Sequence, residues 1–300
     1  MTYELFKEAV MAELTNHFPP DTQITIHSLS HNNGVHLDGL TILEAGCNAA
    51  PAIYLEGYYG MLSQGYSFLQ IYQKILDAYR SLRLQASVDL SFFDDITHLK
   101  KRIVCKLIHY ERNRELLAQI PHVPYLDLAI VFYSLLSADS TSFTTVLIRN
   151  SHLNRWNITS WQLFSLAMTN TPLLLKSRID NLAELLLAHA PKCMPCGTDI
   201  PLIEKINSPL YLLTNQNRLQ GAACILYPNI LSDFSAQRDS DLYIIPSSIH
   251  EVLLLPASAA ISLNALNAMI HEVNGTQLSP EDILSDHVYY YNRNKNKITF

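Results

Sequence analysis

The sequence predicts an α+β protein in which antiparallel strands, paired as hairpins, are covered by amphipathic helices. Three times along the chain, two extended runs are followed by a helical pattern, near residues 23–83, 125–169 and 211–236. Hairpins give antiparallel pairs, whereas a parallel sheet needs a crossover helix between successive strands. Apolar residues make up 48% and charged residues 16% of the 300 positions, a composition that allows a large buried core.

The N-terminal part is predicted to contain a helix over residues 2–18 and a hairpin of 23–29 with 35–43. Two more helices are predicted to follow, one from Pro51 onward and one over 68–82. The first helix has apolar residues every three or four positions and ends before Pro19-Pro20, because proline cannot continue a helix. The hairpin is indicated by Asn33-Gly34, since Asn-Gly between extended runs favours a tight turn. The last helix has the clearest amphipathic pattern of the chain.

The middle part is predicted to contain a strand over residues 102–110 and a second hairpin of 125–136 with 142–149. Two helices are predicted to follow, one from Thr159 onward and one over 179–189. Thr159-Ser-Trp-Gln162 fits a capping box. In that motif the Thr hydroxyl accepts from the backbone amide of Gln162, and the Gln162 side chain reaches back to the amide of Thr159. A helix is therefore expected to begin there.

The C-terminal part has a denser pattern of short elements. We expect strands at 211–214, 222–227, 242–245 and 249–255, a short helix after Pro228, a helix carrying Leu263 to Val273, and a closing hairpin of 289–291 with 298–300. Ser279-Pro280 marks one more helix start, because serine can cap a helix and proline fits its first turn.

The best candidate for a connection is the Pro- and Cys-containing stretch 191–208. It would separate an N-terminal α+β region, 1–190, from a C-terminal α+β region, 209–300. The alternative is that both regions pack as one continuous unit.

The charge balance and the cysteines of the sequence indicate which kinds of partner to exclude and which cellular compartment to expect. The 21 Lys and Arg against 27 Asp and Glu give a net charge of −6, which does not attract nucleic acid or an anionic membrane surface. The N-terminus has acids where a signal peptide has bases, and no run reaches the roughly 18 apolar residues of a membrane span. Five scattered cysteines form no disulfide framework. We therefore predict a cytoplasmic protein with no nucleic-acid partner and no membrane association.

Three segments, taken together and in order, resemble a known family. They are Ala50-Pro-Ala-Ile-Tyr-Leu-Glu56, Tyr211-Leu-Leu-Thr-Asn215 with Gly221-Ala-Ala, and Ile245-Pro-Ser-Ser-Ile-His-Glu251, with Pro121-His122 through Asp127-Leu-Ala-Ile-Val131 between them. The chain is similar over nearly its whole length to the bacterial family catalogued as domain of unknown function 5688. The resemblance implies one continuous unit and no particular activity. Ala52 stands where the family usually has Thr, so this chain lacks that hydroxyl.

One segment brings together the side-chain types of nucleophilic catalysis. Its candidate catalytic residues are Ser247, Ser248, His250 and Glu251, a hydroxyl, an imidazole and a carboxylate within a few positions. On a strand, Ser248 and His250 would share one face about 7 Å apart while Glu251 points to the other. A third member would then come from elsewhere, with Asp241, Glu272 and Asp286 as candidates. In the structural alternative, the serines bond backbone groups and the other two are hydrogen-bonded at a sheet margin.

A metal site is the second chemical possibility. Cys193-Met-Pro-Cys196 is a C-x-x-C pair, and His189 lies four residues earlier. Two thiolates and an imidazole are three of the four ligands that zinc usually takes. The sequence does not identify a fourth, so the alternative is that these are incidental loop cysteines. No phosphate-binding glycine motif occurs, and no cofactor is predicted.

The candidate binding surface consists of Tyr54, Glu56, Thr214 and Asn215, which lie in the resembling segments. Tyrosine presents an apolar body with a polar tip, so such residues can line a groove as well as fill a core. Two functional hypotheses follow. The first is a non-enzymatic binding or interaction protein that engages an unknown protein or small molecule. The alternative is a hydrolase or transferase that uses Ser247 or Ser248 with His250.

Overall fold

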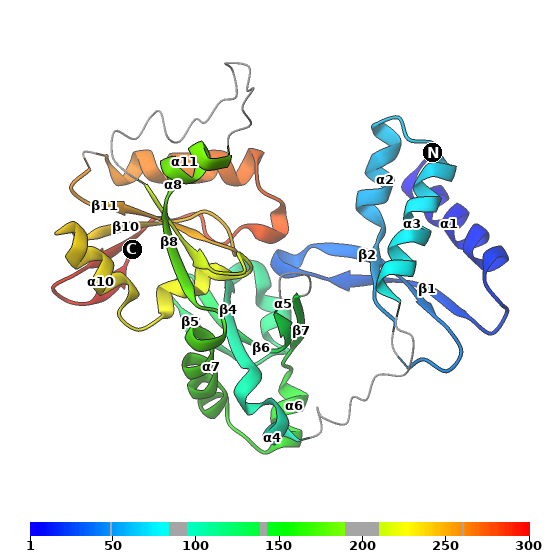
Figure 1. Cartoon of the computed structure of the whole chain (residues 1–300), viewed down its shortest axis with the longest axis horizontal. Helices are drawn as coiled ribbons and strands as arrows, with labels where there is room; N and C mark the ends of the chain where they lie inside the picture. The colour runs from blue at the N-terminus through cyan, green and yellow to red at the C-terminus, as the bar shows by residue number, and fades with distance from the viewer. Residues whose placement is uncertain (49, 84–94, 139–142, 190–209, 260) are drawn as a thin grey trace. The chain divides into compact units, whose positions relative to one another are not determined.

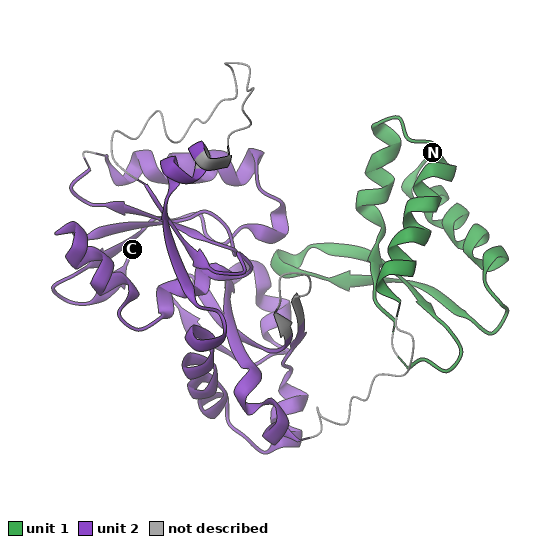
Figure 2. Ribbon diagram, viewed as in Figure 1, with its two compact units in different colours: residues 1–92 green, residues 93–300 purple. Residues whose placement is uncertain are grey.

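A computed structural model describes the chain except for residues 49, 84–94, 139–142, 190–209 and 260. Figure 2 shows two compact units, Met1–Phe92 and Phe93–Phe300. The connection expected at 191–208 lies outside the described residues, and a domain boundary there stays a prediction. The strands on either side of it, β8 (Ser177–Asn181) and β9 (Tyr211–Asn215), are antiparallel neighbours in one sheet.

The first unit is a three-stranded antiparallel sheet with three helices. Its elements are α1 (Tyr3–His17), β1 (Gln23–Ser30), η1 (Asn32–Gly34), β2 (His36–Leu43), β3 (Ile53–Tyr54), α2 (Leu55–Ser63) and α3 (Phe68–Leu82), with strand order β1-β2-β3. The predicted hairpin is confirmed, and Asn33 and Gly34 both have positive φ values, 60° and 70°. Asn and Gly are favoured at such positions because their left-handed backbone costs them little.

The core of this unit lies between the sheet and the helices. Helix α3 has the predicted bounds, and its capping box joins Ser67 and Gln70. Its apolar stripe packs with residues of α1 and β2 in one buried cluster that includes Phe6, Leu40 and Ile75. The sequence pattern therefore identified both the helix and the face that it buries.

The second unit contains a six-stranded sheet and a four-stranded sheet, both antiparallel (Figure 1). Its first half consists of α4 (Ile96–Leu99), η3 (Lys100–Arg102), β4 (Ile103–His109), η4 (Glu111–Asn113), α5 (Arg114–Leu117), β5 (His122–Tyr125), β6 (Leu128–Ala138), β7 (Phe143–Leu147), α6 (Asn150–Trp156), α7 (Ser160–Leu174), β8 and α8 (Leu182–His189). Its second half consists of β9, η5 (Gly221–Leu226), α10 (Ile230–Arg238), β10 (Leu242–Pro246), β11 (Val252–Pro256), α11 (Leu263–Thr276), η6 (Pro280–Asp282), β12 (Tyr289–Asn292) and β13 (Lys297–Thr299). The strand orders are β13-β12-β10-β11-β9-β8 and β4-β6-β5, with β7 also paired to β6.

A different helix packs on each face of the six-stranded sheet (Figure 1). Helix α11 packs on one face through Leu266 and Ile270, in a cluster with Leu253 and Leu255 of β11. Helix α10 lies on the other face, where Phe234 meets the ring of Tyr211 with centroids 5.0 Å apart. The α+β class with mostly antiparallel sheets, predicted from the sequence, is confirmed.

Helix α7 covers the outer edge of strand β4. The predicted capping box of Thr159 and Gln162 starts this helix. Near its other end, the Thr171 hydroxyl accepts from the backbone N–H of Cys105 at 3.0 Å, and the Asn170 amide donates to the carbonyl of Ile103 at 2.9 Å. A helix therefore supplies the partners that a neighbouring strand would otherwise give, which protects the edge from unwanted pairing.

Replacing Thr171 by valine is expected to lower the free energy of unfolding by roughly 1–3 kcal/mol, because the buried amide of Cys105 loses its acceptor while the side-chain shape is kept. Urea denaturation measures this loss. The matched control is Thr169→Val on the exposed face of the same helix. Equal stabilities of the two variants would contradict the role of Thr171 at the strand edge.

Four local predictions differ from the structure. Residues 222–227, predicted as a strand, form the 3₁₀ helix η5, because small residues at 221–223 let this segment pack tightly against β9. The run 125–136 is interrupted by a turn at Leu126, whose φ is 56°. The first residues of the predicted helix 179–189 belong to β8. The strand predicted over 249–255 begins at Val252, after a turn.

Candidate functional site

The predicted catalytic segment forms the turn between β10 and β11. The hydroxyl of Ser248 donates to Glu251 Oε1 at 3.0 Å and accepts from the backbone N–H of His250 at 3.0 Å. Ser248 is only 3% exposed. Because these residues form a turn, they lack the alternating directions assumed for a strand, and Glu251 bonds to the serine, not to the imidazole. Ser247 lines a small cavity of about 30 Å³ under α11.

Both ring nitrogens of His250 have partners other than a serine. Its Nδ1 accepts from the backbone N–H of Gln220 at 3.1 Å, and its Nε2 lies 3.3 Å from Asp282 Oδ1. Asp282 is thus the acid beside this imidazole, and no sequence pattern connects two residues that lie 32 positions apart. This arrangement favours the structural interpretation of the segment, since the imidazole holds two turns together and does not contact a nucleophile.

The other acids proposed for this site have different partners. Asp241 accepts from the hydroxyl of Tyr290 at 2.6 Å and from the backbone N–H of Arg293 at 2.9 Å. Asp286 pairs with Arg112 at 2.7 Å. Glu272 lies in α11, and among the described residues the ring nitrogens of His250 bond to Gln220 and Asp282 instead.

Thr214 and Asn215 lie inside the second unit, since each is 0% exposed. The Thr214 hydroxyl donates to the carbonyl of His250 at 2.8 Å, and the Asn215 side chain bonds the backbone of its own turn. Gly221 allows the segment after β9 to pack closely against the turn between β10 and β11. A Cβ atom on Gly221 would lie 2.3 Å from Thr214 Oγ1 and 2.6 Å from the His250 carbonyl oxygen. These residues hold turns together and present no surface to a partner.

Tyr54 and Glu56 belong to the first unit. Tyr54 is 39% exposed and its ring meets that of His31. Glu56 Oε1 accepts from the Tyr3 hydroxyl at 3.0 Å and from the backbone N–H of Asp38 at 2.6 Å. Burial, together with the hydrogen bond to Glu56, raises the pKa of Tyr3. Of the four residues of the predicted binding surface, Tyr54 is the one whose side chain is most exposed.

The proposed zinc ligands cannot be placed together. Cys193 and Cys196 lie outside the described residues, and His189 ends α8. Within the part of the chain that the structure describes, no group of three or more His, Cys, Asp and Glu side chains is arranged to hold a metal ion. The zinc site stays a prediction.

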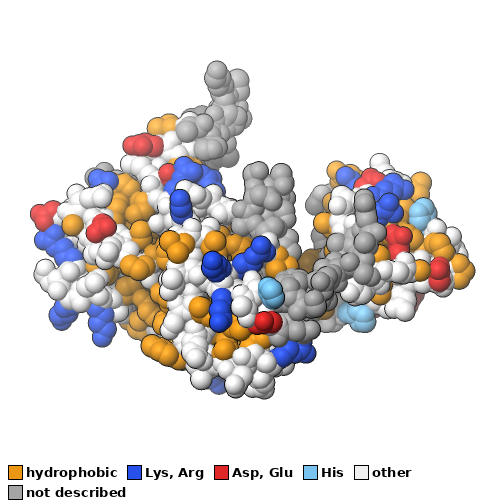
Figure 3. Space-filling model, turned by 60° about the horizontal axis from the view of Figure 1, so that its bottom comes forward, with side chains coloured by type: hydrophobic (Ala, Val, Ile, Leu, Met, Phe, Trp, Pro, Cys, Tyr) orange, Lys and Arg blue, Asp and Glu red, His pale blue; other side chains and the backbone are white. Residues whose placement is uncertain are grey.

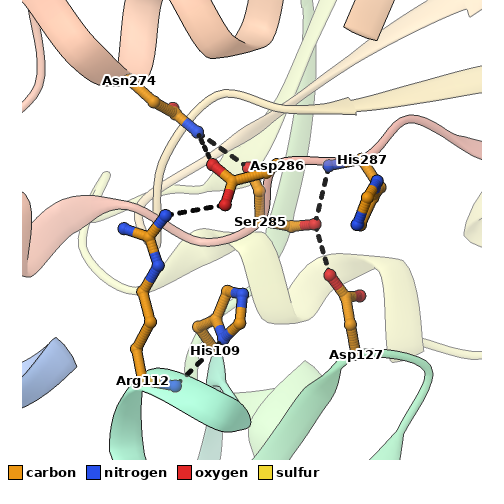
Figure 4. Close-up of polar contacts among 7 residues, drawn as sticks. All are labelled: His109, Arg112, Asp127, Asn274, Ser285, Asp286 and His287. Carbon is orange, nitrogen blue, oxygen red and sulfur yellow. Dashed lines mark hydrogen bonds and ion pairs between the residues drawn. The ribbon is translucent and has the colours of Figure 1, made fainter.

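A polar cluster that the sequence did not reveal joins the two sheets of the second unit (Figure 4). Asp127, in the turn between β5 and β6, accepts from the hydroxyls of Ser285 and Tyr289, each at 2.6 Å. Both hydroxyls belong to fully buried residues. Burial, followed by the nearby charge of Asp127, raises the pKa of Tyr289. Asp127 belongs to one of the segments that resemble the family, but no spacing rule links it to residues 158 and 162 positions later.

A second part of this cluster surrounds His109. Figure 4 shows its ring between Arg112 and Asp127, below Ser285 and Asp286. Its Nδ1 accepts from the backbone N–H of Arg112 at 3.3 Å. Burial would by itself raise the pKa of Asp286, but hydrogen bonds from Asn274 and Arg112 lower it. Ser285 donates to a carboxylate and not to the imidazole, so the cluster has the residues of a catalytic triad without its connections.

The pKa of His109 is lowered from 6.5 by burial. The unfolded chain therefore takes up a proton at a higher pH than the folded chain does, so the stability from His109 is complete above about pH 6.5 and falls as the pH drops below it. We expect His109→Gln to reduce the loss of unfolding free energy between about pH 7 and pH 5.5. Urea denaturation at both pH values measures it. An unchanged pH dependence in the variant would contradict this assignment.

A groove of about 710 Å³ lies on the surface of the second unit. We call it the apolar groove. It is lined by Tyr125, Leu126, Ile130, Phe164, Met168, Ile225, Leu226, Tyr227, Pro228, Asn229, Leu231, Ser232, Tyr291, Asn296, Lys297 and Ile298. Hydrophobic side chains gather on the face of this unit seen in Figure 3. The groove is built from segments far apart in sequence, which no motif could have brought together.

A second groove of about 630 Å³ has a more polar lining. It lies beside α10 and the edge strand β8, and includes Arg178, Glu184 and Arg238. The guanidinium of Arg238 stacks over the ring of Tyr211 at 4.5 Å. Charges of both signs line this groove, so it does not indicate one class of ligand.

Comparison with known proteins gives one match. The model of a family of unknown function, DUF5688, matches residues 3–293, nearly the whole chain. No curated protein and no solved structure matches. None of the helices in the described residues has the length and apolar character needed to cross a membrane.

Proposed function

The chain belongs to DUF5688, a family of unknown function, and we propose that it is a non-enzymatic binding protein whose ligand occupies the apolar groove. The observation that carries this proposal is the groove itself. Its volume of about 710 Å³ falls within the range of about 300–1,000 Å³ that small-molecule sites usually have. A small molecule is therefore the favoured ligand class.

The lining supports an apolar ligand. Ile130, Phe164 and Met168 contribute hydrophobic side chains from β6 and α7, and tyrosines supply rings with polar tips. Ligand sites in proteins combine such a lining with a few polar groups that fix orientation. Here Asn229, Ser232 and Asn296 can serve that purpose.

The absence of enzymatic activity is also part of the proposal. Ser248 is bonded to Glu251, and Ser285 is bonded to Asp127. Each serine therefore donates to a carboxylate, while His250 and His109 accept backbone amides through Nδ1. A nucleophilic serine needs a base within hydrogen-bond reach.

We propose a cytoplasmic location for this binding activity. The described cysteines Cys47, Cys105 and Cys224 are free thiols, which fits a reducing compartment. A partner protein or nucleic acid is not required by the groove, so the proposed partner is the small-molecule ligand alone.

Fluorescence of Nile red, a neutral apolar dye, tests the proposal. The dye should bind the full-length protein, and Met168→Glu should weaken binding at least about tenfold, because a carboxylate in the groove must be desolvated when the dye enters.

Thr169→Glu is the matched control, since Thr169 is exposed on the next position of α7 and does not line the groove. Its affinity for the dye should equal that of the unmodified protein. Thermal melting of both variants checks that they fold. Absence of dye binding, or equal weakening by both substitutions, would refute the proposal.

A further inference from the structure

We infer that the apolar groove selects amphipathic molecules that carry one negative charge, such as long-chain carboxylates. This inference rests on the proposed function and adds the ligand class to it. Among the residues that line the groove, Lys297 is the single charged one. The remaining lining is apolar or carries neutral polar groups, so the groove has one positive charge, at Lys297.

Lys297 is available to a ligand. It is an exposed residue of β13, at the end of the six-stranded sheet. No ion pair joins it to an acid among the described residues. Ammonium groups attract carboxylates and donate to them. A carboxylate in the groove would therefore find a partner that no acid of the described chain already occupies.

The charged residue of the lining and the apolar side chains of α7 come from different elements. The hairpin of β12 and β13 contributes Lys297 together with Asn296, whose Oδ1 accepts from the Tyr291 hydroxyl at 2.8 Å. Helix α7 contributes Phe164 and Met168. A ligand with a charged head and an apolar tail matches this division, with its head at the hairpin and its tail toward α7.

The size of the effect follows from the exposure of Lys297. An exposed ion pair contributes about 0.2–1 kcal/mol, so the charge should change affinity about 1.4- to fivefold. The apolar tail supplies most of the affinity, and the lysine discriminates between charged and neutral head groups.

Displacement of Nile red by dodecanoate and by dodecanol tests the inference, because the two ligands share a tail and differ in charge. Lys297→Met keeps an apolar stem and removes the ammonium. It should weaken the binding of dodecanoate about 1.4- to fivefold and leave the binding of dodecanol unchanged. Lys297→Arg should retain the preference. Lys295→Met is the control, since Lys295 is exposed on the same hairpin and does not line the groove.

The outcomes separate the two claims. If Nile red binds and Met168→Glu blocks it, but Lys297→Met affects both ligands equally or neither, the charge preference is wrong and the proposed function stands. If Nile red does not bind at all, both are wrong. If Lys295→Met weakens dodecanoate as much as Lys297→Met, the effect comes from the overall field of the protein and the inference is overturned.

Discussion

Gly221→Ala is expected to destabilise the protein by about 3 kcal/mol or more. The added Cβ would lie 2.3 Å from Thr214 Oγ1, 2.6 Å from the His250 carbonyl oxygen and 2.7 Å from the Asn215 amide nitrogen. Two of these atoms are backbone, so they cannot move aside by a side-chain rotation. Chemical denaturation of the purified variant measures the loss.

Gly275→Ala is the matched control in the same unit. It lies within α11, and a Cβ there meets nothing within 4 Å. Alanine favours a helix over glycine by up to about 1 kcal/mol, so this variant should be at least as stable as the unmodified protein. Equal effects of the two substitutions would contradict the close packing of the turns.

Asp127→Ala is expected to cost roughly 4 kcal/mol, because it leaves the buried hydroxyls of Ser285 and Tyr289 without an acceptor. The carboxylate joins the β5–β6 turn to the segment before β12, so its loss weakens the contact between the two sheets. Asp127→Asn keeps one acceptor oxygen, and about half the loss is expected for it.

A double-mutant cycle isolates this contact. Tyr289→Phe should destabilise the unmodified protein but have little further effect in Asp127→Ala, because the two residues share one hydrogen bond. Additive losses in the cycle would show that the two side chains act independently and would contradict the proposed link.

The sequence predicted elements whose signals are local. Helix α3 has its predicted bounds, because a stripe of apolar residues and a capping box agree. The β1–β2 hairpin follows from Asn33-Gly34, two residue types that adopt a left-handed backbone at little cost. Such features depend on neighbours a few positions apart, which one sequence is enough to reveal.

Elements that depend on distant contacts were missed. The apolar run 222–227 has the composition of a buried strand, but it forms most of a 3₁₀ helix whose first residue, Gly221, lies close to Thr214. The turn between β5 and β6 has Leu126, not Gly or Asn, at its left-handed position, and this backbone is held by surrounding contacts. The same limit applies to function. Ser248 and His250 are two positions apart in sequence, whereas the residues that line the apolar groove are spread from Tyr125 to Ile298.

The most direct measurement is a crystal structure of the protein grown with dodecanoate. The account predicts the acyl chain in the apolar groove against Phe164 and Met168, with the carboxylate beside Lys297. A ligand bound elsewhere, or a groove that stays free of ligand under saturating dodecanoate, would contradict it.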